Sequence, residues 1–216
     1  MIRRTPIRAL FALLVAASLA GGCATRPAAR MEASGLASGC PTSQPPPLPA
    51  GQTPTISIET PKGAISVKVE GDRSPIAAGN LVALAACGFY DGVVFHRVVP
   101  GFVIQGGDGQ FGRKATFDAR RVGSGGPGYT IKDEAVHSPY HRGTVAMART
   151  AQPDSQGSQF FIVLDDAAGP TLAKANTYSI VGDVTAGMEV VDAIAAAADA
   201  EAPTNPVEMT RVTVEP

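Results

Sequence analysis

The sequence predicts a mainly β protein, a closed eight-stranded antiparallel barrel capped by two α-helices. Three observations carry this prediction: short apolar runs that alternate with polar residues, two well-separated segments with helical spacing, and 24 glycines and 18 prolines that supply many turns. Hydrophobic residues make up 44% of the 216 residues and charged residues 17%. This composition allows a packed core and argues against global disorder.

The first 22 residues are expected to form an export signal, with arginines before a short apolar run at residues 10–19. Small residues then lead to Cys23, as in a bacterial lipobox, although Ala20 stands where such boxes usually carry leucine. We expect a lipid on Cys23 and a location on the periplasmic side of a bacterial membrane, with the outer membrane favoured because Ala24 follows the cysteine. Cleavage to a soluble periplasmic form is the alternative.

Residues 23–53 are rich in Ala, Pro, Ser, Gly and Thr and show no apolar periodicity, so we expect a disordered tether there. Residues 54–216 are expected to form one folded domain. Cys87 is expected to be a small buried hydrophobe. A bridge from Cys87 to Cys40 in the tether is left open, because the spacing does not argue for it.

The elements of the folded domain are predicted from periodicity and turn residues. Alternating residues at 55–60 and 65–69 flank a Pro-Lys-Gly turn and indicate a β-hairpin. Ser74 before Pro75 predicts a helix start with serine as the cap, and Gly88 predicts its end. A second helix is expected at 188–198 and a closing strand at 207–214. Short strands are expected between the helices, at 93–95, 102–105, 144–148, 159–164 and 178–181.

Two stretches carry the candidate chemistry. The first, residues 95–108, reads FHRVVPGFVIQGGD and places Arg97 among apolar residues. A guanidinium in such surroundings needs a partner or a ligand, and an ion pair with Asp108 or Glu134 is a purely structural alternative. The second, residues 147–162, leads from a polar loop into Gln159 and two phenylalanines. On its own, this second stretch is typical of a loop followed by a core strand.

Together the two stretches resemble the signature regions of the cyclophilins, F-H-R-x-x-x-x-F-x-x-Q-G-G-D and M-A followed by G-S-Q-F-F-I. The segment GFYDG at residues 88–92 precedes the first, as in bacterial members of that family. The resemblance spans about residues 55–215. It implies a cyclophilin-like barrel and peptidyl-prolyl cis–trans isomerase activity, which requires neither a metal nor a cofactor.

The resemblance assigns roles position by position. Arg97 corresponds to the family's catalytic arginine, and Gln105 and Gln159 correspond to glutamines that bind substrate backbone or orient the arginine. Ala148 and Arg149 correspond to the edge that pairs with substrate backbone. The expected apolar walls of the proline pocket are Phe102, Val103, Phe161, Leu172 and Tyr178.

Proline-containing polypeptides are therefore the expected partners. A net charge of −1 without a basic patch argues against nucleic acid, and membrane contact is expected only through Cys23. We expect a monomer. The chain has no tryptophan, so weak cyclosporin binding is expected. An insertion at 110–121 is basic and either favours acidic substrates or is a solvated loop. A catalytically silent, tethered peptide-binding or chaperone module on the same fold is the alternative function.

Overall fold

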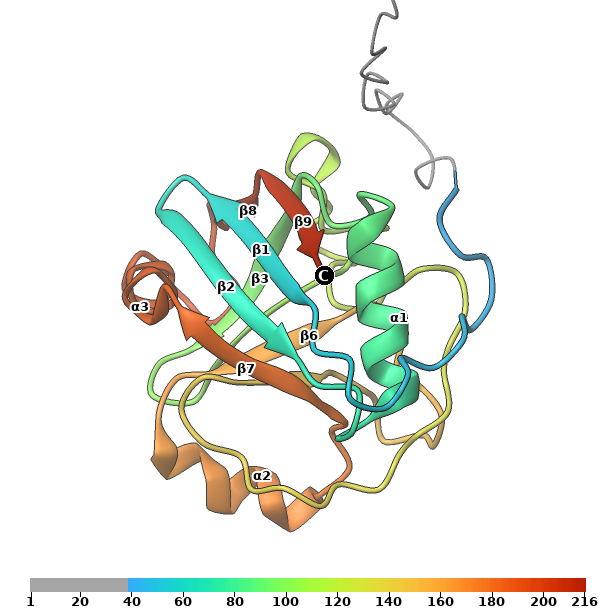
Figure 1. Cartoon of the computed structure of the whole chain (residues 1–216). Coiled ribbons are helices and arrows are strands. Elements are labelled where there is room, and N and C mark those ends of the chain that lie inside the picture. The colour runs from blue at the N-terminus through green and yellow to red at the C-terminus, as the bar shows by residue number, and fades with distance from the viewer. Residues whose placement is uncertain (1–38) are drawn as a thin grey trace, which may run out of the picture. The chain divides into compact units, whose positions relative to one another are not determined.

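The computed structural model describes residues 39–216; the predicted export signal, Cys23 and the tether as far as residue 38 lie outside this part. The strands form one sheet in the order β8-β3-β4-β6-β5-β7-β2-β1-β9, with every neighbouring pair antiparallel (Figure 1). The strands are β1 (Thr55–Thr60), β2 (Gly63–Val69), β3 (Val93–Val99), β4 (Val103–Gly106), β5 (Thr144–Met147), β6 (Phe160–Val163), β7 (Ile180–Ala186), β8 (Glu208–Met209) and β9 (Arg211–Glu215).

The mainly β, antiparallel prediction is confirmed, but the count of eight strands is wrong. The single strand expected at 207–214 is divided at Thr210 into β8, which pairs with β3, and β9, which pairs with β1. The Thr210 N–H donates to the Glu59 carbonyl at 2.7 Å. One short segment therefore lies at both ends of the sheet order, and the barrel is nearly closed, with an interruption at the residue where the chain changes its partner strand.

Three α-helices accompany the sheet, where two were predicted: α1 (Pro75–Ala86), α2 (Gly169–Ala175) and α3 (Met188–Ala196). Figure 1 shows α1 and α3 near opposite ends of β1 and β2, whereas α2 lies apart from both. The missed helix α2 has seven residues, and Leu172 is its buried large side chain, so no helical periodicity is readable there. Within residues 39–216, no helix has the length and apolar character needed to cross a membrane.

The start of α1 differs from the prediction in its cap. Ser74 holds the N-cap position, but its hydroxyl has no hydrogen-bond partner within the described part of the chain. The carboxylate of Glu134 instead accepts hydrogen bonds from the N–H groups of Ile76 and Ala77, each at 2.8 Å. A carboxylate at this end also complements the helix dipole, so a residue 58 positions away in sequence replaces the local cap.

The prediction that Cys87 is a free, buried hydrophobe is wrong. Cys87 follows α1 and forms a disulfide with Cys40, with their Cα atoms 5.2 Å apart. The bridge attaches the segment before the barrel to the end of the helix. It joins residues 47 positions apart, a separation that the sequence alone gave no reason to connect.

The last part of the expected tether, residues 39–53, also packs on the domain. Leu48 is buried, and its N–H donates to the Pro75 carbonyl at 2.8 Å. A β-carbon on Gly79 of α1 would lie 2.4 Å from the Pro46 carbonyl oxygen, so this close approach requires glycine. An extended proline-rich segment can pack on a helix without any apolar repeat, which is why the pattern predicted disorder here.

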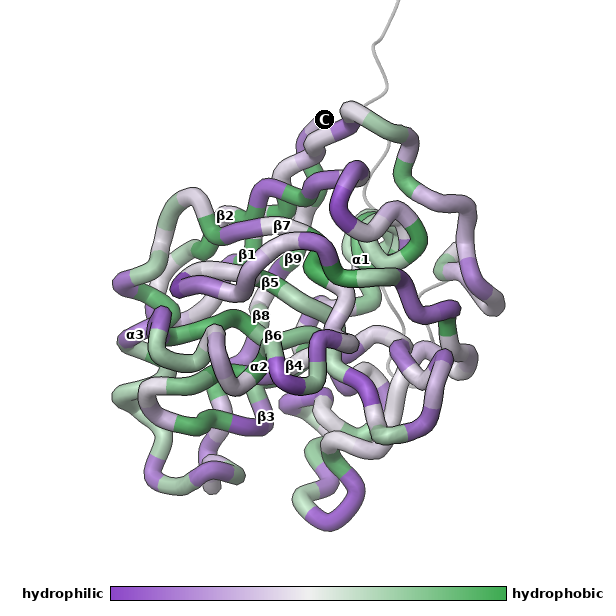
Figure 2. The backbone as a smooth tube through the Cα atoms, turned by 90° about the horizontal axis from the view of Figure 1, so that it is seen from below, coloured by the Kyte–Doolittle hydropathy of each residue, from purple (hydrophilic) through white to green (hydrophobic). Residues whose placement is uncertain are grey.

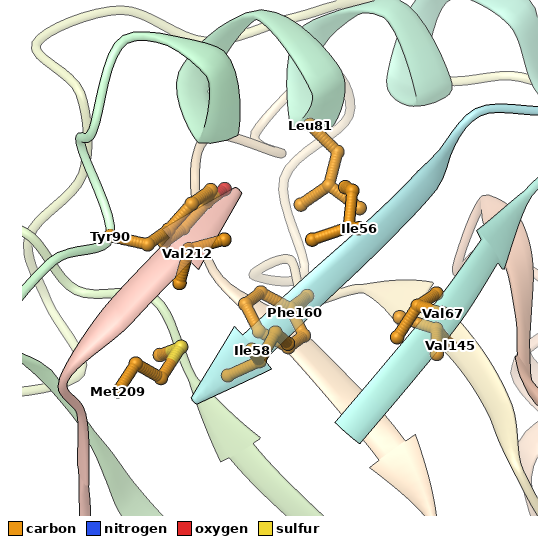
Figure 3. Close-up of a pocket in the computed structure, with 9 residues that line it drawn as sticks. All are labelled: Ile56, Ile58, Val67, Leu81, Tyr90, Val145, Phe160, Met209 and Val212. Atoms are coloured by element: carbon orange, nitrogen blue, oxygen red, sulfur yellow. The ribbon is translucent and has the colours of Figure 1, made fainter. Parts of the chain in front are cut away.

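Alternating side chains of the strands fill the barrel. In Figure 2, hydrophobic segments run through the strands in the middle, and much of the hydrophilic colour lies in the outer loops. A void of about 10 Å³ lies inside, beneath α1 (Figure 3). It holds at most about one water molecule and has an apolar lining, so it is a packing defect of the core. Its lining comprises Ile56, Ile58, Val67, Leu81, Tyr90, Val145, Phe160, Met209 and Val212.

Candidate active site

The candidate site begins as a row of residues across four adjacent strands. Arg97 on β3 is paired with Gln105 on β4, Gln105 with Phe161 on β6, and Phe161 with Ala146 on β5. Side chains alternate between the two faces of a strand. Phe160 lines the void inside the barrel, so its neighbour Phe161 faces outward. The row therefore brings a guanidinium, an amide and an aromatic ring together on the outer surface.

The predicted pocket walls gather beside this row, in an apolar cluster distinct from the barrel core. Phe161 and Tyr178 are in edge-to-face contact, with ring centroids 5.4 Å apart. Leu172 reaches the cluster from the unpredicted helix α2 and is buried. The structure thus brings together the predicted residues Phe102, Val103, Ala148, Phe161, Leu172 and Tyr178.

Tyr140 belongs to the same cluster and was missed by the sequence analysis. It is buried, and its hydroxyl donates to the main-chain carbonyl of Tyr178 at 3.0 Å. Burial raises the pKa of Tyr140 to about 12, which keeps this donor protonated. Tyr140 lies in a loop after Pro139, where no periodic signal identifies a buried side chain. It fixes the position of Tyr178 at the cluster's edge.

Arg97 forms an ion pair, but its partner is neither of the two acids that the sequence suggested. Its Nε donates to Oε1 of Glu201 at 2.7 Å, and the two side chains are 38% and 63% exposed. Glu134 is engaged at the start of α1. Asp108 is fully buried and also engaged elsewhere, so the proposed pairs of Arg97 with these two acids do not form.

The Asp108 carboxylate organises the glycine-rich loop instead. Its Oδ1 accepts from the N–H groups of Gln110 and Phe111 at 3.0 and 2.9 Å, and its Oδ2 accepts from those of Gly123 and Gly125 at 2.8 and 3.0 Å. Four main-chain donors satisfy a carboxylate that would be costly to bury without partners. Asp108 therefore fixes the start of the 110–121 insertion and the glycines that follow its end.

The two predicted glutamines are directly connected. Nε2 of Gln105 donates to Oε1 of Gln159 at 3.0 Å. Nε2 of Gln159 donates to the carbonyls of Gly123 and Gly125 at 2.9 and 2.8 Å. Gln159 thereby holds the glycine-rich loop against β4, and the Oε1 atom of Gln105 accepts no hydrogen bond from the described residues.

A groove of about 540 Å³ extends from these glutamines along the glycine-rich loop, residues 123–128. Ala148 and Arg149 form part of its opposite wall. The Arg149 guanidinium is largely buried and binds Asp133 at 2.7 Å and the Gln152 carbonyl at 2.8 Å. The charge of Arg149 is thus used within its own loop, close to the predicted substrate edge.

The 110–121 insertion folds onto the domain. Arg113 donates to the carbonyls of Phe89 and Asp91, and Lys114 donates to that of Pro206. Arg121 stacks on Phe111, 3.7 Å from the ring centroid. Three of its basic residues are therefore used in internal contacts. Among residues 39–216, no three His, Cys, Asp or Glu side chains are grouped to hold a metal ion.

Fold and site define a β-barrel protein with an apolar cluster on its outer face, next to an arginine and two glutamines. The sequence matches the family model described as cyclophilin type peptidyl-prolyl cis-trans isomerase/CLD over residues 55–214. The chain belongs to this cyclophilin family.

Relatives and solved structures agree with this assignment. The chain is 41% identical over 165 residues to a probable peptidyl-prolyl cis-trans isomerase of Brucella abortus, covering 74% of this chain and 82% of the relative. It is 37% identical over 142 residues to a peptidyl-prolyl cis-trans isomerase of Acinetobacter baylyi, covering 65% and 71%.

A cyclophilin type isomerase of Cryptosporidium parvum has a similar crystal structure, with a TM-score of 0.64 and 26% identity, covering 76% of this chain and 99% of that one. A second crystal structure of that protein, determined in the presence of the dipeptide Ala-Pro, aligns with a TM-score of 0.62 and 26% identity, covering 75% and 99%.

Proposed function

We propose that this protein accelerates rotation about X–Pro bonds in exported polypeptides and thereby assists their folding. The observation that carries the proposal is the cross-strand row in which Arg97 and Gln105 stand beside Phe161 and the outer apolar cluster. A proline ring fits an apolar pocket of aromatic and aliphatic side chains. The polar groups next to it can bind the peptide backbone on either side of the ring.

The chemistry needs no covalent intermediate. Amide resonance opposes rotation by about 18–20 kcal/mol, and unassisted X–Pro exchange takes tens to hundreds of seconds. A guanidinium that donates to the prolyl nitrogen favours the pyramidal, single-bond-like nitrogen of the twisted transition state. Arg97 would supply this donor, Phe161 and its neighbours would hold the ring, and Gln105 would hold the adjacent backbone.

Export and lipid attachment form the second part of the proposal. The N-terminal signal pattern and Cys23 motivate it. The Cys40–Cys87 disulfide supports it, because disulfides persist in oxidising compartments such as the bacterial periplasm. Mass spectrometry of the protein purified from its native membrane tests this directly. We expect an acylated cysteine as the first residue; an unmodified N-terminus would exclude the lipid anchor.

The folding role is tested by refolding a protein whose slow phase is limited by prolyl isomerisation. Catalytic amounts of the mature protein should accelerate that phase in proportion to enzyme concentration, without changing the final yield. A silent peptide-binding module would leave the rate constant unchanged at substoichiometric concentration. That outcome would replace the enzymatic proposal with the chaperone alternative.

A further inference from the structure

Arg97, the predicted catalytic residue, is bound by Glu201, which the sequence did not single out and which lies 104 positions away in the chain. Glu201 lies in the segment between α3 and β8. It is attached to β3 twice: its Oε1 accepts from Arg97 Nε at 2.7 Å, and its carbonyl accepts from the Val98 N–H at 2.8 Å. Main chain and side chain of one residue thus hold the arginine and its immediate neighbour.

The segment that carries Glu201 is itself closed by a short-range contact. Oδ1 of Asp199 accepts from the N–H of Thr204 at 2.9 Å, so the residues around Glu201 form a loop with a fixed end. The main-chain bond to Val98 then sets the distance of this loop from β3. Glu201 is therefore presented to Arg97 by an ordered loop, although its own side chain is exposed.

The geometry of the pair is that of an orienting contact. A guanidinium is planar and carries five N–H donors in a fixed fork, so a bond at Nε restricts the whole plane. Within residues 39–216, neither terminal nitrogen of Arg97 has a hydrogen-bond partner. The four terminal donors stay available for a ligand while Glu201 restrains the stem.

The Arg97–Glu201 ion pair is expected to contribute little to the stability of the fold. Exposed ion pairs contribute little to folding because water screens them and two long side chains must be ordered. Asp108 and Glu134, the acids named as alternative partners of Arg97, are occupied by main-chain donors elsewhere, so they do not replace Glu201. Ordering an otherwise rotatable arginine beside a reacting bond, in contrast, has a direct effect on rate.

We propose that Glu201 is a positioning residue for Arg97, which it holds by Nε so that the terminal nitrogens meet the prolyl bond. This inference rests on the proposed isomerase function. Glu201 acts through the arginine and does not touch the substrate. Its effect should therefore fall on kcat more than on KM, and it should disappear when the guanidinium is removed.

The test compares four variants of the mature protein with wild type: Glu201→Ala, Glu201→Gln, Arg97→Ala and the double variant. We expect Glu201→Ala to lower kcat/KM about 5- to 50-fold, mainly in kcat. Glu201→Gln keeps an oxygen acceptor and should recover most of the rate. In the Arg97→Ala background, Glu201→Ala should have no further effect.

The matched control is Glu189→Ala, which removes the same charge from an exposed position of α3 that forms no hydrogen bond or ion pair with Arg97. It should retain wild-type activity. An active wild type with an unchanged Glu201→Ala variant would overturn the inference alone. Equal losses from Glu201→Ala with and without Arg97 would do the same. An inactive wild type would overturn the proposed function, and this inference with it.

Discussion

Gln105 and Gln159 are hydrogen-bonded side chain to side chain, with Nε2 of Gln105 donating to Oε1 of Gln159 at 3.0 Å. Because Gln159 also donates to the carbonyls of Gly123 and Gly125, this pair connects the arginine row to the glycine-rich wall of the groove. Gln159 therefore contacts both the Gln105 side chain and the glycine-rich loop. The contact with Gln159 also fixes the Gln105 side chain, whose Oε1 atom is the acceptor that the proposed function assigns to the peptide backbone.

Replacing Gln159 by alanine should release both the glycine-rich loop and the Gln105 amide. We expect kcat/KM to fall about tenfold and the free energy of unfolding to fall by about 1 kcal/mol, because the lost bonds are partly exposed. Peptide isomerisation and urea unfolding measure the two effects. Gln152→Ala, at an exposed position of the neighbouring loop, is the control and should change neither. Unaltered activity in Gln159→Ala would show that the loop needs no such support.

The disulfide should stabilise the domain without affecting catalysis. The variant with both Cys40 and Cys87 replaced by alanine should lose roughly 2–4 kcal/mol of unfolding free energy, because the bridge restricts the unfolded chain over 47 positions. Urea unfolding with and without reductant measures this, and reduced wild type should match the variant. The kcat/KM value should stay within about twofold. Equal stability of the oxidised wild type and the variant would contradict the attachment of residues 39–53.

His96 should make folding stability depend on pH. It is buried next to Arg97, and both ring nitrogens are without hydrogen-bond partners in the described part of the chain. Desolvation lowers its pKa below the usual value of 6.5, and the nearby Asp108 opposes this shift only in part. The unfolded chain therefore takes up a proton that the folded protein resists.

The stability that His96 contributes is thus present above pH 6.5 and is lost as the pH falls toward the lowered pKa of the folded state. Urea unfolding between about pH 7.5 and about pH 5 measures this loss. The variant His96→Gln should show a smaller decrease over the same range. Identical pH dependence in both proteins would contradict the lowered pKa, because it would mean that His96 titrates alike in the folded and unfolded states.

The sequence predicted the elements whose signal is local. Short apolar runs located the strands that carry Gln105 and Phe161, and the two family signatures linked these residues with Arg97 into one site. The strand expected at 93–95 continues to Val99 and so includes Arg97. What it missed depends on contacts between distant segments. The change of strand partner at Thr210, the cap from Glu134, the bridge to Cys40 and the ion pair with Glu201 each join residues that no periodicity relates. The helix that carries Leu172 was too short to show a repeat.

The central claim is that Arg97 catalyses rotation and does not merely bind peptide. Exchange NMR on an Ala-Pro peptide tests it directly, because peak positions report binding while exchange rates report isomerisation. Wild type should accelerate exchange, and Arg97→Ala should lose about 10²- to 10³-fold of that acceleration while still shifting the peptide resonances. Equal exchange rates with wild type and Arg97→Ala, or no acceleration by either, would contradict the account.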